Sequence, residues 1–342
     1  MSALPHQVSN HKLRVLTGAF LALFAAAAVQ PSEDERVVLG EGAQRFEWVK
    51  GWGKLPEGMQ LGNTHGSVLL DKAGRVYLNT DTEHSVVVFD AAGKFLESWG
   101  GNELAGGVHG MWIQSEGDAE FLYLAHIGRR EVLKTTLKGE IVWRLGCPLE
   151  SGKYDKPEQW APTSVVVAPD GSIVVADGYG RSWIHVFDAE RKYVRSFGGP
   201  GSEVGQLSTP HGLWLELVEG KPELLVADRE NHRLQRFDLE GKRLGEPIGG
   251  LRRPCSAHAL NGEIVVADLA GRVTLLDSTG KLLAHLGDNP DESKRAQNGV
   301  PREQWRDGEF LSPHSARLAP NGDIYVADWN YLGRVTKLAR LR

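Results

Sequence analysis

Four of the twelve histidines stand at corresponding points of a sequence pattern that recurs along the chain. They are His65, His109, His211 and His314, and each stands where an apolar segment begins. Imidazole is a common metal ligand, and three imidazoles with one open coordination position form the usual catalytic zinc site. If the fold brings three of these side chains together, they predict a site for zinc or another divalent transition metal.

A repeat of about 40–50 residues positions these histidines. The clearest copies cover residues 164–199 and 212–250, and others cover 65–101, 109–146, 256–287 and 315–342. Each copy contains short strands rich in Val, Leu and Ile, separated by Asp-Gly, Asn-Gly or Glu-Gly pairs. Such pairs favour hairpin turns, because glycine reaches positive φ without steric cost. Four antiparallel strands per repeat describe a propeller blade.

Six copies predict an all-β, six-bladed β-propeller over residues 44–342. The last copy ends after three strands, and the segment Phe46–Gly66 resembles Tyr193–Gly212, which leads from one blade into the next. The N-terminal segment is therefore predicted to supply the missing outer strand of blade six. Residues near Phe46–Trp52 should pair with Arg334–Leu341, which removes an open sheet edge.

In this architecture His109, His211 and His314 begin the innermost strands of blades two, four and six. Alternate blades lie about 120° apart around the axis, so the three imidazoles should converge. Nitrogen ligands favour zinc or a similar ion over calcium. The alternative is structural, with each histidine capping its strand through a hydrogen bond to backbone.

The same end of the channel contains further candidates. The other innermost strands begin at His65, Thr163 and Cys255, and Cys255 has the alternative role of a small buried filler. Tyr179 is either a channel-lining aromatic or a phenolic acid or base beside a cation that lowers its pKa. Arg181 follows it in the same turn. The second strands end at Thr80, His126, Asp177, Asp228, Asp268 and Asp328, and we expect the aspartates to accept backbone N–H bonds.

The connection over residues 287–313 is long and polar, and it opens on the same face as the histidines. Long loops in compact domains are commonly functional. A partial lid is expected here, with Trp305, Arg302 and Arg306 facing a ligand. The alternative is a solvated loop.

The N-terminus indicates export. Lys12 and Arg14 precede the apolar run Val15–Val29, and Ala26 and Ala28 offer a small-x-small cleavage site. Residues 1–30 are thus expected to be a signal peptide, or an anchor if uncleaved, and 31–43 a linker. The protein would be periplasmic or extracellular, touching a membrane only through an uncleaved segment. The net charge of −5 argues against nucleic-acid binding, and two cysteines exclude a disulfide-dense scaffold.

The repeats resemble NHL repeats, and the chain from about residue 44 resembles the peptidyl-α-hydroxyglycine α-amidating lyases. The similarity is carried by "VHGMW" (108–112), "DGYGRSWIHVF" (177–187), "PHGLW" (210–214), "VADRENHRLQRF" (226–237) and "SPHSARL" (312–318). The resemblance implies that His109, His211 and His314 bind zinc and that Tyr179 is the base. The implied reaction splits a C-terminal α-hydroxyglycine into a peptide amide and glyoxylate.

Two positions depart from that family. Asp81 stands where the family has a catalytic arginine in blade one, which reverses the charge there. Ser315 stands where the family has an aspartate that helps to hold calcium, so calcium is doubtful here.

Two functions remain open from the sequence. One is a metal-dependent lyase-type enzyme acting on a small polar or peptide-like substrate in the channel mouth. The other is a non-catalytic NHL-repeat module that binds a protein or glycan on one face. A calcium-dependent lactonase is a weaker third possibility, because that chemistry requires carboxylates at the axis.

Overall fold

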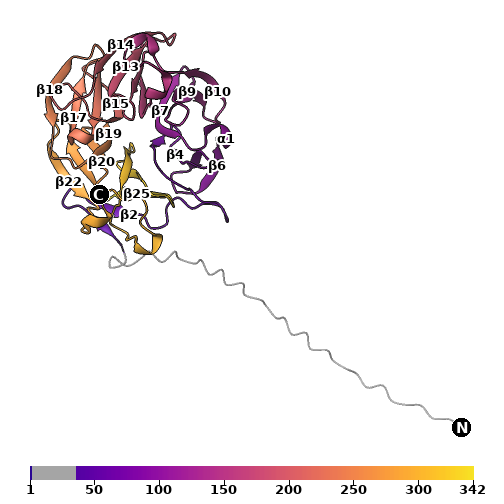
Figure 1. Ribbon diagram of the computed structural model, residues 1–342. Coiled ribbons are helices and arrows are strands. Elements are labelled where there is room, and N and C mark those ends of the chain that lie inside the picture. Colours follow the sequence, from indigo (N-terminus) through magenta and orange to yellow (C-terminus); the bar gives the residue numbers. More distant parts are fainter. Residues whose placement is uncertain (2–35) are drawn as a thin grey trace. The chain divides into compact units, whose positions relative to one another are not determined.

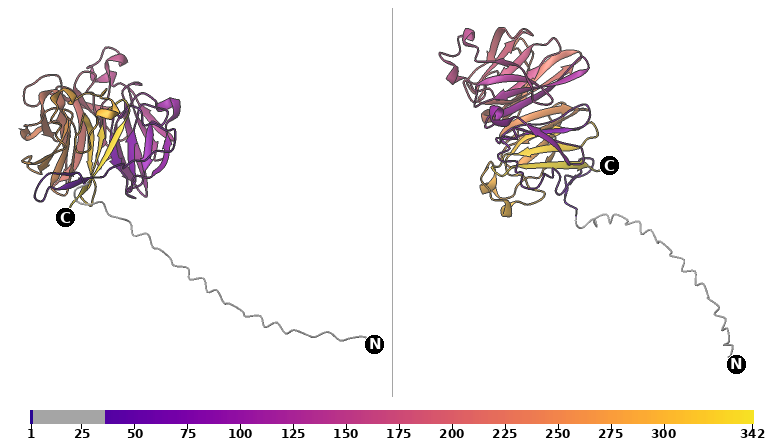
Figure 2. Two further views of the ribbon diagram at one scale, coloured as in Figure 1. Left: turned by 90° about the horizontal axis from the view of Figure 1, so that it is seen from below. Right: turned by 90° about the vertical axis from the view of Figure 1, so that its right-hand side faces the viewer.

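Six antiparallel sheets surround a common axis, as expected for a six-bladed propeller (Figures 1 and 2). The computed structural model describes Met1 and residues 36–342, of which 37–342 form one compact unit. The predicted signal segment, 1–30, lies outside the described residues. Among the described residues no helix is long and apolar enough to cross a membrane.

Each blade runs from an innermost to an outermost strand. Blades one to three are β3 to β6 (Val68–Leu70, Val76–Asn79, Val86–Phe89, Phe95–Trp99), β7 to β10 (Val108–Glu116, Ala119–His126, Glu131–Thr136, Ile141–Leu145) and β11 to β14 (Ser164–Val167, Ile173–Ala176, Trp183–Phe187, Tyr193–Gly198). Blades four and five are β15 to β18 (Pro210–Val218, Lys221–Asp228, Arg233–Phe237, Arg243–Ile248) and β19 to β22 (Pro254–Leu260, Glu263–Asp268, Arg272–Asp277, Leu282–Leu286). Blade six is β23 (Pro313–Leu318), β24 (Ile324–Asp328), β25 (Arg334–Arg340), β2 (Phe46–Trp48) and β1 (Val38–Leu39). The short helix α1 (Gly101–Leu104) connects blades one and two.

The N-terminal segment closes the ring, which confirms the predicted pairing. Strand β2 lies antiparallel to β25, with Phe46 opposite Arg340 and Trp48 opposite Leu338. Figure 1 accordingly shows β2 beside β25. Val38–Leu39 fall within the predicted linker 31–43 but pair with β2 as a fifth, outermost strand. Because β2 pairs with β25, the third strand of the last blade has no open edge.

The middle strands are continuous apolar runs because each sheet packs on both faces. All four residues of Val86–Phe89 are buried, and so are all four of Ile173–Ala176. A strand that alternated apolar with polar residues would place polar groups between two blades. The repeat therefore holds its blades together chiefly by burial of aliphatic side chains, which is non-directional and follows the apolar area removed from water.

Local irregularities in four innermost strands position the axial side chains. The register with the neighbouring strand shifts between Val108 and Met111 in β7 and between Pro210 and Leu213 in β15, and equivalent shifts begin at Pro254 in β19 and Pro313 in β23. The residues left unpaired include His109, His211, Cys255 and His314. A bulge bends the strand and re-aims its side chain. Here the bulges occur where the imidazoles enter the channel.

Candidate functional site

Four histidines from four different blades meet at one end of the channel. His65, His109, His211 and His314 each offer one ring nitrogen, and these nitrogens all lie within 4.8 Å of one another. The rings of His109, His211 and His314 are almost fully buried. Their centroids are 4.6–4.9 Å apart. The alternate-blade histidines thus converge as the repeat predicted, and His65 joins them.

Backbone carbonyls orient three of these rings. Nδ1 of His109 lies 2.7 Å from the Thr163 carbonyl, Nδ1 of His211 2.9 Å from that of Cys255, and Nδ1 of His314 2.8 Å from that of Gly66. A carbonyl can only accept, so each Nδ1 carries the ring proton. Nε2 of each ring is therefore unprotonated and offers a lone pair, which on His211 faces the Tyr179 hydroxyl. Metal-binding histidines are typically held in this way.

Steric constraints explain why glycine follows two of the histidines. A Cβ at Gly110 would lie 2.3 Å from the Thr163 oxygen, and one at Gly212 would lie 2.5 Å from the Cys255 oxygen. These are the same oxygens that accept the His109 and His211 protons. Glycine therefore allows the neighbouring blade close enough to hold the imidazole.

Burial keeps the cluster neutral. It holds the pKa values of His109, His211 and His314 well below the ordinary value of 6.5. The pKa of His65 falls to about 4, through burial and then through the positive charge of Arg229. Neutral imidazoles are the form that binds a metal ion.

A tyrosine and an arginine complete the site. The Tyr179 hydroxyl lies 2.9 Å from Nε2 of His211 and 3.1 Å from Nε2 of His65. Arg229 donates to the same hydroxyl over 3.2 Å, and its guanidinium lies over the phenol ring. Burial raises the pKa of Tyr179 to about 12, while Arg229 acts in the opposite direction. The hydroxyl is therefore surrounded by proton acceptors and one cation.

Buried polar groups fix the turn that carries Tyr179. Asp177 accepts backbone N–H bonds from Ala161 and Arg181, and it also accepts the Tyr154 hydroxyl over 2.6 Å. The Tyr154 oxygen lies 2.6 Å from Nε2 of His185. The aspartates at the ends of the other second strands likewise accept backbone N–H groups, as the sequence predicted: Asp228 from Ser208, Asp268 from Arg252 and Arg253, and Asp328 from Leu311 and Ser312.

His185 should make the propeller less stable in acid. Burial lowers its pKa from 6.5 to about 3, so the native state holds it neutral and unfolding takes up a proton below pH 6.5. Stability from this group is complete above pH 6.5 and is lost as pH falls towards 3. Between pH 7 and 5 it should account for about 2 kcal/mol of the fall in unfolding free energy. Urea unfolding of His185→Gln should give a flatter pH profile, whereas His232→Gln, on an exposed turn, should not; an unchanged slope in His185→Gln would contradict this role.

Comparison with known proteins identifies the repeat and its relatives. Residues 160–187 match the NHL repeat. A 265-residue stretch is 31% identical to rat peptidylglycine α-amidating monooxygenase, covering 72% of this chain and 25% of the relative. A 132-residue stretch is 36% identical to a probable peptidyl-α-hydroxyglycine α-amidating lyase of Caenorhabditis elegans, covering 38% of this chain and 36% of that protein. A peptidyl-α-hydroxyglycine α-amidating lyase of Drosophila melanogaster is 26% identical over 251 residues, covering 72% of this chain and 58% of that protein.

This chain is a six-bladed propeller with an NHL repeat at residues 160–187, and it resembles the amidating lyases. It spans about a quarter to just under three fifths of the length of these relatives. The shared fold extends further. A gluconolactonase from Xanthomonas campestris superposes with a TM-score of 0.61 at 13% identity, covering 91% of this chain and 99% of that chain. An inactive virginiamycin B lyase from Staphylococcus aureus gives 0.54 at 14% identity, covering 84% and 98%. At such identities these structures support the fold alone.

Three other residues that the sequence analysis proposed for the channel lie against the histidine cluster. Thr163 and Cys255 hold His109 and His211 through their carbonyls, and the Thr163 hydroxyl donates to the Pro210 carbonyl. Burial raises the pKa of the Cys255 thiol to about 12, so the thiol is protonated. Cys255 and Cys147 are both free. Ser315, one residue beyond His314, accepts the backbone N–H of Val68.

Three candidates lie outside the cluster. Asp81 is exposed and accepts the backbone N–H of Asn63. His126 is buried, and its Nδ1 accepts the N–H of Arg129, so it takes the structural place that aspartates fill in other blades. Arg181 extends into solvent towards Asp155, 3.5 Å away. None of the three touches the four histidines.

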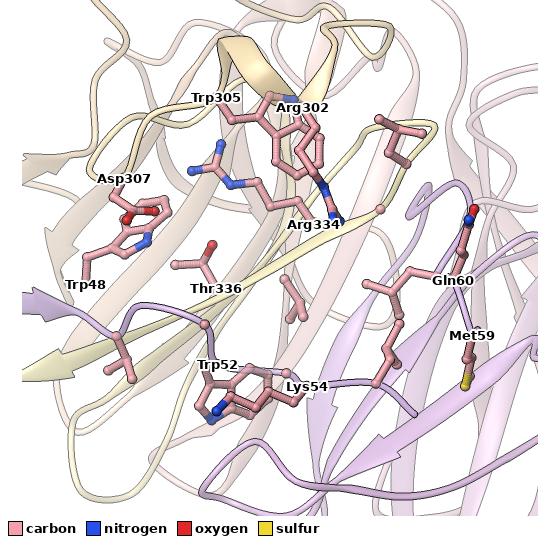
Figure 3. Close-up of a pocket in the computed structure, with 18 of the residues that line it drawn as sticks. Trp48, Trp52, Lys54, Met59, Gln60, Arg302, Trp305, Asp307, Arg334 and Thr336 are labelled. Carbon is pink, nitrogen blue, oxygen red and sulfur yellow. The ribbon is translucent and has the colours of Figure 1, made fainter. Parts of the chain in front are cut away.

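The long loop lines a separate pocket of about 800 Å³ (Figure 3). Trp305 and Arg302 lie in its wall, where Arg334 stacks on Trp48 and lies near Trp305. The Trp305 indole donates to the Val300 carbonyl. The lining of this pocket includes none of the four histidines, so the structure does not place Trp305 in the axial channel. Arg306 is exposed.

Two residues of the site escaped the sequence interpretation. Arg229 and Trp329 both stand one position beyond the end of a second strand, after Asp228 and Asp328. Trp329 stacks on His65 with ring centroids 4.6 Å apart. The positions that directly follow these second-strand ends include both residues, together with Asp81 in blade one. Arg229 is the one basic residue among these six positions.

Proposed function

We propose that this chain is a lyase that uses a zinc-like ion to cleave a peptidyl-α-hydroxyglycine or a closely similar small hydroxylated substrate. The observation that carries the proposal is the convergence of three neutral, backbone-oriented imidazoles beside Tyr179 and Arg229. A protein that only binds a partner does not need several imidazole acceptors and a largely buried arginine to converge on one point. The named relatives supply the reaction class.

The residues fit a transition-metal ion. Nε2 of His109 and Nε2 of His314 are buried and have no hydrogen-bond partner within the described part of the chain. Leaving such acceptors unsatisfied is costly. His109, His211 and His314 would be the ligands, and a set of three nitrogens suits zinc better than calcium. When bound, such an ion polarises a substrate oxygen and favours the phenolate form of Tyr179.

The proposed chemistry needs one proton acceptor that later returns the proton. Tyr179 accepts the proton of the substrate hydroxyl. The C–O bond becomes a carbonyl as the neighbouring C–N bond breaks, and its electron pair moves to nitrogen. Tyr179 then donates the proton to that nitrogen. The products are a peptide amide and glyoxylate, with all atoms of the substrate accounted for and no oxidant consumed.

In this proposal Arg229 binds the substrate carboxylate. Its Nε pairs with Glu230, and its NH1 reaches the Tyr179 hydroxyl, so one edge of the guanidinium faces the reacting group. Guanidinium pairs with carboxylates through charge-assisted hydrogen bonds. In this chain Arg229, from blade four, would therefore supply the positive charge that Asp81 cannot supply from blade one.

Glyoxylate release from an α-hydroxyglycine peptide by the zinc-loaded protein tests the proposal. Arg229→Met should lower kcat/KM roughly 10–100-fold, because hydrogen bonds to charged groups contribute about 1.5–3 kcal/mol. The loss should be much smaller for a substrate whose carboxylate is esterified. Arg181→Met, which removes an exposed arginine from the turn that carries Tyr179, is the matched control. No glyoxylate from the zinc-loaded wild type would reject the lyase activity and leave the metal site standing.

A further inference from the structure

The axial channel has a second tier of side chains below the histidines. Trp112, Trp214, His258 and Arg317 stand three residues beyond His109, His211, Cys255 and His314 on the same innermost strands. Both tiers line one narrow cavity of about 40 Å³.

Arg317 places an unpaired positive charge in this cavity. Its guanidinium stacks on the Trp214 ring, 4.5 Å from the centroid. Among the described residues no carboxylate or carbonyl oxygen pairs with it, although guanidinium has five N–H donors. Burial lowers the pKa of Arg317 to about 9, so the group is charged at neutral pH. Arg317 is only partly exposed, and a positive charge with restricted access to water and no anionic partner is unfavourable.

The groups around Arg317 are also donors. Nδ1 of His258 accepts the backbone N–H of Leu318, so the ring proton is on Nε2. The indole N–H of Trp214 is buried and has no acceptor in the described residues.

Three serine hydroxyls of the channel add to these donors. Each accepts a backbone N–H from the next blade, which leaves its own O–H available: Ser164 from Leu213, Ser256 from Ala316 and Ser315 from Val68. The two tiers thus differ in chemistry. The histidine tier offers lone pairs, whereas the lower tier offers N–H and O–H groups.

We propose that the lower tier binds one small monovalent anion of halide size, held by Arg317 and the neighbouring N–H and O–H donors. A halide ion fits the cavity, because about 10–15 Å³ of such space already accommodates a water molecule and the cavity offers about 40 Å³. Chloride satisfies this requirement and accepts several donors at once. The site is independent of the reaction proposed above, since none of its donors touches Tyr179 or Arg229.

Bromide provides a direct test. Crystals of the wild-type protein grown with bromide in place of chloride should show one anomalous peak within hydrogen-bonding distance of the Arg317 guanidinium. Crystals of Arg317→Met should lack that peak. A bromide found only among the four histidines would mark a metal-bound halide and overturn the proposal, as would a wild-type channel without bromide.

Thermal unfolding tests the site in solution. At constant ionic strength, replacing gluconate by chloride at ten times the dissociation constant should raise the Tm of wild type by roughly 2–4 °C. Arg317→Met should lose this rise, and Arg317→Lys, which keeps the charge with fewer donors, should retain part of it. Arg191→Met is the matched control, because Arg191 also lies over a tryptophan, Trp143, but on the exposed surface. An equal chloride response in wild type and Arg317→Met would exclude the site, and the wild-type bromide result stands even if a variant does not fold.

Discussion

His211→Ala should lose tight binding of the metal ion, whereas wild type should bind one zinc-like ion per chain. His211 is almost fully buried and lies in ring contact with both His109 and His314. Loss of its Nε2 leaves two ligands that cannot complete the site. Because removing even an outer partner of a ligand costs 10–100-fold in affinity, removing the ligand should cost more than about 100-fold.

Elemental analysis after zinc loading and gel filtration measures this effect. His84→Ala is the control, because His84 bonds to Ser98 in blade one and is absent from the cluster. It should keep the wild-type stoichiometry. Equal and negligible metal in wild type and His211→Ala would end the metal proposal, and equal full occupancy would remove His211 from the ligand set.

Tyr179→Phe should reduce glyoxylate release by about 10²–10⁴, the range typical of general acid and base groups. The substitution keeps the ring that packs between His65, His109 and His211 and removes only the hydroxyl. The metal content should therefore stay at the wild-type level. The loss should appear in kcat more than in KM, because the hydroxyl acts on the proton in transit.

Parallel rate and metal measurements separate the two roles of Tyr179. A slow variant with full metal content supports proton transfer by the phenol. A slow variant that has also lost its ion would show instead that the hydroxyl holds the histidines in place. If the variant is as fast as wild type, Tyr179 is a channel-lining aromatic and another group moves the proton.

Much of the fold was predictable because its signals are local. Asp-Gly and Asn-Gly turns recur in step with Val-rich strands, and this periodicity defines each blade. The truncated last copy and the copy-like segment after Phe46 together predicted the closure, which the pairing of β2 with β25 confirms. Val38–Leu39 carried no such signal, since two residues of an outermost strand show no alternation.

The candidate site was predictable only as far as the repeat reaches. Equivalent positions in successive blades necessarily lie at one height, so the convergence of His109, His211 and His314 followed from spacing. Arg229 and Trp329 lie one residue beyond the strand end, where the backbone turns. There the regular alternation of side chains ends, so the repeat does not predict in which direction a side chain points. Trp305 was misleading for a related reason, because its loop opens on the histidine face but packs beside β2 and β25.

The propeller, the number of blades and the height of each axial residue follow from the repeat pattern, because they depend on turns and strands within one repeat. Which atoms meet across the axis depends on how the blades pack against one another. The carbonyls of Thr163, Cys255 and Gly66 hold the imidazoles, Arg229 from blade four reaches Tyr179 of blade three, and Arg317 remains without an anionic partner among the described residues. Each of these contacts joins groups far apart in the chain, and their distances follow from how neighbouring blades pack rather than from any local pattern.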